Sequence, residues 1–121
     1  PTEIQATLKA AKHYPHKEIW CVFQPHTYTR TKAFLEDFAD ALSLADIVVL
    51  ADIYAARETD TLGISSGDIQ KRLQDAGTTA YYFHSFDEIE QFLLKKCMNG
   101  DLLITMGAGD IVNVGEHLLG Q

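Results

Sequence analysis

Four short apolar runs separate longer amphipathic segments along the chain. Successive apolar residues without alternation are typical of strands that are buried on both faces of a parallel sheet. On this basis we predict strands over 18–24, 46–52, 79–84 and 101–106. The second run, with five apolar residues from Ile47 to Ala51, is the clearest of the four.

The segments between these runs carry apolar residues at helical spacing. We predict helices that begin near Thr2 and Ser85, where the spacing fits a capping box, and near Ser65. A further helix over 29–42 would face its partners with Phe34, Leu35, Phe38 and Leu42. A last helix should follow 107–110, whereas 54–63 has no period and is predicted to be a loop.

This alternation predicts an α/β fold: a Rossmann-like three-layer sandwich in which a mostly parallel sheet is flanked by helices. Ligands of such sheets bind beyond the carboxyl ends of the strands. The segments expected there are 24–30, 52–58, His84-Ser85 and 107–110.

Length, charge and cysteine content narrow the class of protein. A chain of 121 residues suits one domain, and a net charge of −7 makes a nucleic-acid or anionic-membrane surface unexpected. No apolar run is long enough to span a membrane, and no signal peptide is visible. The two separated cysteines, Cys21 and Cys97, fit a reducing cytoplasm better than a disulfide framework.

The segment 23–31 is the first candidate for binding chemistry, because it follows a predicted strand and opens a predicted helix. A cation in the first helical turn opposes the helix dipole, so Arg30 invites a compensating anion. Backbone amides, Arg30 and His26 could together bind a carboxylate or a phosphate. The alternative is that Arg30 forms an ion pair with a surface carboxylate.

The segment 52–58 is the second candidate. Asp52 ends a buried strand and Glu58 lies in the loop behind it. These carboxylates could bind a ribose hydroxyl, a metal-bound water or a substrate amine. The alternative is that Asp52 caps the turn and Glu58 is solvated.

The chain offers weaker signals elsewhere. Gly107-Ala108-Gly109-Asp110 could seat a phosphate, but a tight turn with Asp110 as the N-cap explains it as well. There is no P-loop, no Gly-x-Ser-x-Gly, and no histidine pair at metal-ligand spacing. We therefore expect neither a metal site nor a catalytic residue within this chain.

Four motifs together resemble the C-terminal domain of the UDP-N-acetylmuramate–L-alanine ligases, which belong to the Mur ligase family. They are Pro1-Thr2-Glu3, Phe-Gln-Pro-His-x-Tyr-x-Arg-Thr at 23–31, Asp-x-Tyr-Ala-Ala-x-Glu at 52–58 and Gly-Ala-Gly-Asp at 107–110. They cover nearly the whole chain in the family's order, and 23–31 is the most specific. Thr2 and Glu3 would end a His-His-Pro-Thr-Glu interdomain motif, so the remaining histidines and the P-loop are expected upstream.

The resemblance implies a three-domain enzyme of the bacterial cytoplasm. In this family ATP, with Mg²⁺, phosphorylates the carboxylate of UDP-N-acetylmuramate, and the amine of L-alanine then attacks the acyl phosphate. The partners implied are the N-terminal UDP-sugar-binding domain and the central ATPase domain of the same chain. The C-terminal domain closes over the central one, so residues 1–121 are expected to fold as one domain that is inactive alone.

The resemblance also suggests roles for individual residues. His26 and Arg30 would lie on the L-alanine side, with Arg30 as the partner of its carboxylate, whereas Asp52, Tyr54 and Glu58 would line the nucleotide side of the cleft. One departure is Thr27, which stands where many family members have arginine.

Two other interpretations stay open at this point. One is the related ligase that recycles murein tripeptide, although its segment after the first strand departs from the pattern at 24–31. The other is a stand-alone binding module with a flavodoxin-like sheet.

Overall fold

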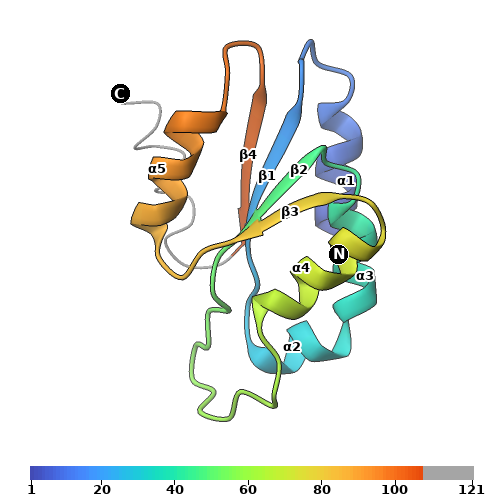
Figure 1. Ribbon diagram of the computed structural model, residues 1–121. Coiled ribbons are helices and arrows are strands. Elements are labelled where there is room, and N and C mark those ends of the chain that lie inside the picture. Colours follow the sequence, from blue (N-terminus) through green and yellow to red (C-terminus); the bar gives the residue numbers. More distant parts are fainter. Residues whose placement is uncertain (108–121) are drawn as a thin grey trace.

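The structure, a computed structural model, describes residues 1–107 and contains a single parallel sheet in that part of the chain (Figure 1). Its strands are β1 (Ile19–Gln24), β2 (Ile47–Leu50), β3 (Thr79–Tyr82) and β4 (Leu102–Gly107), in the order β3-β2-β1-β4. In the register, Trp20 of β1 lies between Ile47 and Leu103. All four predicted strands are confirmed, with ends that differ by at most two residues.

Helices cover both faces of the sheet. They are α1 (Thr2–Ala11), α2 (Tyr28–Ala33), α3 (Leu35–Leu42), α4 (Ser66–Asp75) and α5 (Phe86–Lys96). Figure 1 shows α1, α3 and α4 on one side of the sheet and α5 on the other. The predicted three-layer α/β arrangement is therefore confirmed.

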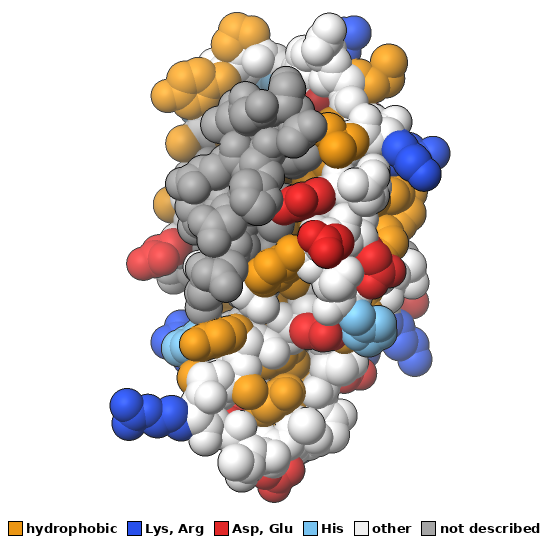
Figure 2. Space-filling model, turned by 90° about the vertical axis from the view of Figure 1, so that its left-hand side faces the viewer, with side chains coloured by type: hydrophobic (Ala, Val, Ile, Leu, Met, Phe, Trp, Pro, Cys, Tyr) orange, Lys and Arg blue, Asp and Glu red, His pale blue; other side chains and the backbone are white. Residues whose placement is uncertain are grey.

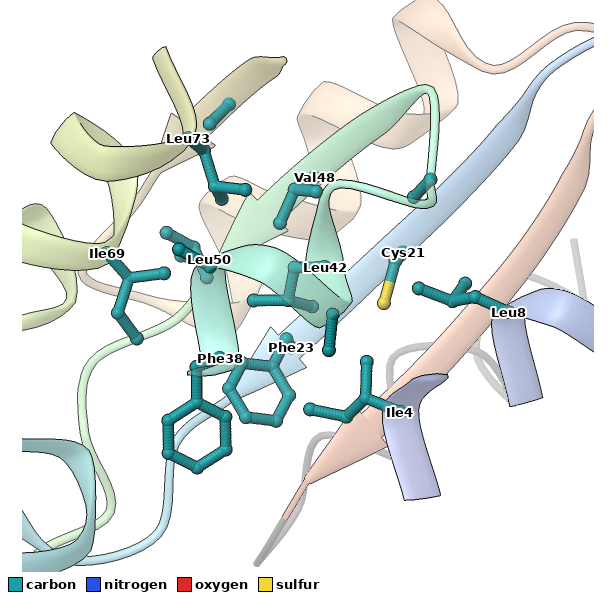
Figure 3. Close-up of a cluster of buried hydrophobic side chains, with 14 of the residues drawn as sticks. Ile4, Leu8, Cys21, Phe23, Phe38, Leu42, Val48, Leu50, Ile69 and Leu73 are labelled. Atoms are coloured by element: carbon teal, nitrogen blue, oxygen red, sulfur yellow. The ribbon is translucent and has the colours of Figure 1, made fainter. Parts of the chain in front are cut away.

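The main core lies between the sheet and α1, α3 and α4, as Figure 3 shows. Leu8, Leu42, Leu50 and Leu73 are fully buried there. Cys21 is also fully buried, as the apolar run predicted, and burial raises the pKa of its thiol to about 12. A second cluster lies on the opposite face and includes the following residues: Trp20, Val22, Val49, Ala51, Ile89 and Leu93.

Two details of the predicted helices were wrong. The helix expected over 29–42 is two helices, because the backbone leaves helical dihedrals at Phe34 (φ −116°, ψ 27°). The Phe34 side chain is 43% exposed, whereas Phe38 is buried as expected. Thr2 is not a capping residue: it is the first residue of α1, Pro1 is the N-cap, and no side chain bonds to the first turn.

The other two helix starts follow the sequence signals. Ser65 and Asp68 form a complete capping box at α4, and the Ser85 hydroxyl accepts the Glu88 amide at 3.2 Å at the start of α5. The helix and the Asp110 cap predicted beyond Gly107 lie outside the described residues.

The order of the strands defines a switch point. The chain moves from β1 to β2 to β3 on one side, and then crosses so that β4 pairs with the free edge of β1. Gly107 closes this pairing beside Gln24, with a φ of +127°. A Cβ at Gly107 would lie 2.2 Å from the backbone oxygen of Gln24, so only glycine fits. Ligand sites of open parallel sheets lie beyond such a point.

Candidate binding site at the carboxyl edge of the sheet

An open pocket of about 550 Å³ lies at the switch point. The ends of β1 and β4, the start of α1, and side chains of α2 and α3 line it. It thus brings the first residues of the chain, Thr2 and Glu3, together with His26 and Arg30. Phe23, Phe38 and Met106 provide its apolar lining. The sequence did not show that these four polar residues share one pocket.

His26 is fixed by the loop that follows β2. The amide of Thr27 donates to Tyr54 at 2.8 Å, and the amide of Tyr54 donates to Pro25 at 2.8 Å. The rings of His26 and Tyr54 stack with their centroids 5.7 Å apart. His26, for which the resemblance suggests the alanine side, is therefore in contact with Tyr54, for which it suggests the nucleotide side.

The helix α2 carries Arg30, and the backbone amides at its start are bonded to side chains of the domain itself. The carboxylate of Glu58 accepts the amides of Tyr28 and Thr29, the latter at 3.1 Å, and also the hydroxyl of Thr29. Thr27 accepts the Arg30 amide at 3.2 Å, with a φ of +65° that is rare for a β-branched residue. These amides are consequently taken and do not face a ligand. The Thr29 hydroxyl is the main cause that lowers the pKa of Glu58 below its ordinary value.

Arg30 itself is exposed and, within residues 1–107, forms no ion pair. The predicted alternative, an ion pair between Arg30 and a surface carboxylate, is therefore not found within residues 1–107. The anion that compensates the helix start is Glu58, which lies 28 residues further along the chain and which sequence spacing could not connect to α2.

Asp52 belongs to a different cluster. Its carboxylate accepts the hydroxyl of Tyr82 and lies 2.9 Å from Nδ1 of His84, while its backbone oxygen accepts the Gln24 amide group at 3.1 Å. Burial, followed by the bond to Asp52, raises the pKa of Tyr82. The cluster adjoins a smaller pocket of about 320 Å³, which Tyr28 also lines. Tyr82 was read from the sequence only as a strand residue.

Residues 1–107 give no support for a metal site, a membrane-spanning helix or a continuous basic surface on the face shown in Figure 2. No group of three or more His, Cys, Asp or Glu side chains is placed to hold a metal ion there. No helix in this part of the chain combines the length and hydrophobicity needed to cross a bilayer. On the face shown in Figure 2, acidic side chains lie between basic ones that stand apart at the margins. This face therefore does not present a continuous basic surface.

Comparison with known proteins gives a consistent result. Residues 1–109 match the family model described as Mur ligase, glutamate ligase domain. UDP-N-acetylmuramate–L-alanine ligases of Lachnoclostridium phytofermentans and Agathobacter rectalis are 67% and 66% identical over 119 residues, which is 98% of this chain. The chain spans only about a quarter of the length of these relatives, 25% and 26% respectively. A murein peptide ligase from Psychrobacter arcticus shares the fold, with a TM-score of 0.73 and 20% identity over 99% of this chain and 25% of that one.

Proposed function

The chain belongs to the Mur ligase family, and from this premise we propose that it is the C-terminal domain of an ATP-dependent ligase that joins L-alanine to UDP-N-acetylmuramate. The observation that carries the proposal is the pocket at the switch point, where Arg30 and His26 stand beside an apolar lining. A guanidinium without an ion pair in residues 1–107 suits a small amino acid, because it can bind the carboxylate through two parallel hydrogen bonds.

The rest of the surface would serve the assembled enzyme. Asp52 and Tyr54 lie on the neighbouring loop and would face the nucleotide side of the cleft, whereas Glu58 of the same loop is bonded to the start of α2. Thr2 and Glu3, at the wall of the pocket, would form the junction with the central domain. Closure of the domain over the acyl phosphate would exclude water and so protect this intermediate from hydrolysis.

ATP and Mg²⁺ would be held mainly by the central domain. The chain has no P-loop, and residues 1–107 contain no cluster of carboxylates that could bind the metal ion. The domain would therefore supply recognition and shielding rather than the phosphorylation step. With an N-terminal UDP-sugar-binding domain, the three would work together in the bacterial cytoplasm.

The other interpretations have less support. The murein peptide ligase shares the fold at 20% identity, whereas the relatives named as L-alanine ligases are 66–67% identical. An unrelated flavodoxin-like module does not agree with a family match over residues 1–109.

The experiment that tests the proposal is kinetic analysis of Arg30 variants in the full-length ligase. A charge-assisted hydrogen bond contributes roughly 1.5–3 kcal/mol, so Arg30→Ala should raise the KM for L-alanine by about one to two orders of magnitude. Arg30→Lys should recover only part, because a point charge lacks the planar fork. The KM for ATP should change little.

A matched control is available on the same helix. Lys32 is a second exposed cation of α2, but its Nζ donates to the Leu62 backbone oxygen and it does not line the pocket. Lys32→Ala should therefore leave the KM for L-alanine within about twofold. If Arg30→Ala weakens ATP binding and spares L-alanine, the assignment of this pocket to the amino acid is wrong.

A further inference from the structure

We propose that Glu58 is a positioning residue for Arg30, which fixes the helix that carries the guanidinium and so sets amino-acid affinity without touching the amino acid. This inference rests on the proposed function of the pocket. It assigns to Glu58 a specific task within the cleft-facing loop, and it predicts that the effect of Glu58 depends on Arg30.

The helix α2 cannot hold its own position. It has six residues, far fewer than a helix needs for stability by itself, and it is separated from α3 by the non-helical Phe34. Its one buried residue is Thr31. The orientation of Arg30 therefore depends on contacts that α2 makes with other segments.

Such contacts come from the loop between β2 and α4, where the carboxylate of Glu58 accepts the Tyr28 and Thr29 amides in the first turn of α2. The bond from Lys32 to Leu62 of the same loop joins exposed groups, and we do not expect it to set the position of α2. Glu58 supplies both the hydrogen-bond acceptors and the negative charge that the start of a helix favours. Arg30 directly follows the two residues that Glu58 binds.

The loop between β2 and α4 is itself anchored to the sheet. The two backbone bonds between Tyr54 and the segment after β1 hold its beginning. The hydroxyl of Ser66 donates to Ala51, and the buried side chain of Ile64 holds its end. Because the loop is anchored to the sheet and Glu58 is bonded to α2, Glu58 fixes the position of α2 relative to the sheet.

Glu58 uses most of its hydrogen-bonding capacity within the domain. One carboxylate oxygen accepts the amides of Tyr28 and Thr29, and the other accepts the Thr29 hydroxyl. Of the roughly four acceptor sites of a carboxylate, about one is left for a ribose hydroxyl or an amine. Arg30, in contrast, has its charge free of any ion pair within residues 1–107.

A double-mutant cycle in the full-length ligase tests the proposal. Glu58→Ala should raise the KM for L-alanine about five- to tenfold, with kcat and the KM for ATP within twofold. In an Arg30→Ala background the same change should add less than twofold. Glu58→Gln keeps one acceptor oxygen and should recover part of the affinity; it carries the cycle if the alanine variant does not fold.

The control is Glu88→Ala, which removes a carboxylate from the first turn of α5 on the other face of the sheet. It should leave the KM for L-alanine unchanged, because α5 does not line the pocket. Additive effects of Glu58 and Arg30, or a rise in the KM for ATP alone, would overturn the positioning role while the proposed function stands. If Arg30→Ala leaves the KM for L-alanine unchanged, the proposed function fails and the positioning role fails with it.

Discussion

The two ends of the sheet use charged side chains for different purposes. At the amino end, Asp46 accepts the Ile19 amide at 2.7 Å, and Asp101 accepts the Trp20 indole at 3.0 Å and the Met98 amide at 2.9 Å. These carboxylates are satisfied by the loops around them. At the carboxyl end, the charge of Arg30 faces a pocket and has no ion partner within residues 1–107.

The difference shows how the domain separates stability from recognition. A side chain whose bonds are completed within the fold stabilises it, whereas a side chain that is held in place but left unpaired is available to a ligand. Asp101 illustrates the first case: its pKa is lowered mainly by the Met98 amide and further by the Trp20 indole. Substitutions at the two ends should therefore affect different properties of the protein.

Gly107→Ala should have the largest effect, because Gly107 is at the recognition end and yet is required for packing. The new Cβ would meet the Gln24 backbone, and we expect a loss of about 3 kcal/mol or more in the free energy of unfolding. Gly77→Ala is the control, since Gly77 has a φ of +87° but nothing within 4 Å; it should cost about 1 kcal/mol. Urea unfolding of the 121-residue chain measures both, and equal losses would contradict the close approach of β1 and β4.

Asp101→Asn should come next, with a fall of a few degrees in Tm at pH 7 and an unchanged KM for L-alanine in the full-length ligase. The pKa of Asp101 is lowered in the folded chain, so its ionised form stabilises the fold above the ordinary value of 3.8. This stabilisation is lost as the pH falls through the lowered pKa. The Tm difference from wild type should therefore shrink as the pH falls below 3.8, and a constant difference would show that ionisation of Asp101 is not its cause.

Asp52→Asn should affect stability least. The side chain is about half exposed, and an asparagine oxygen can still accept the Tyr82 hydroxyl. We expect the Tm of the 121-residue chain to stay within a few degrees, while turnover of the full-length ligase falls about three- to tenfold. Unchanged turnover would leave Asp52 with only the structural bonds to Tyr82 and His84.

The fold could be predicted where the signals are local. The apolar runs gave all four strands, and Ser65 and Ser85 marked two helix starts, because capping and burial depend on neighbouring residues. No local sequence signal marks the break between α2 and α3 at Phe34. The Phe34 amide still bonds to Arg30 and the Phe38 amide to Phe34, so helical periodicity continues across a backbone that has turned.

The site was predicted only in part for the same reason. Arg30, His26 and Asp52 could be placed at the carboxyl edge because each follows a predicted strand. Their division into a pocket and a separate cluster depends on residues far away in the sequence. Glu3 reaches the pocket from α1, and Glu58 reaches α2 across a long loop.

The strand order also has a consequence for the time at which the pocket forms during synthesis. One wall comes from β1 and the other from the end of β4, about 80 residues later. A growing chain can pair β1, β2 and β3 first, since their connections are shorter and cost less entropy to close. The other edge of β1 then stays unpaired until β4 has been synthesised. A nascent chain that stops before residue 102 would consequently expose an unpaired strand and lack the wall of the pocket that Met106 and Gly107 provide.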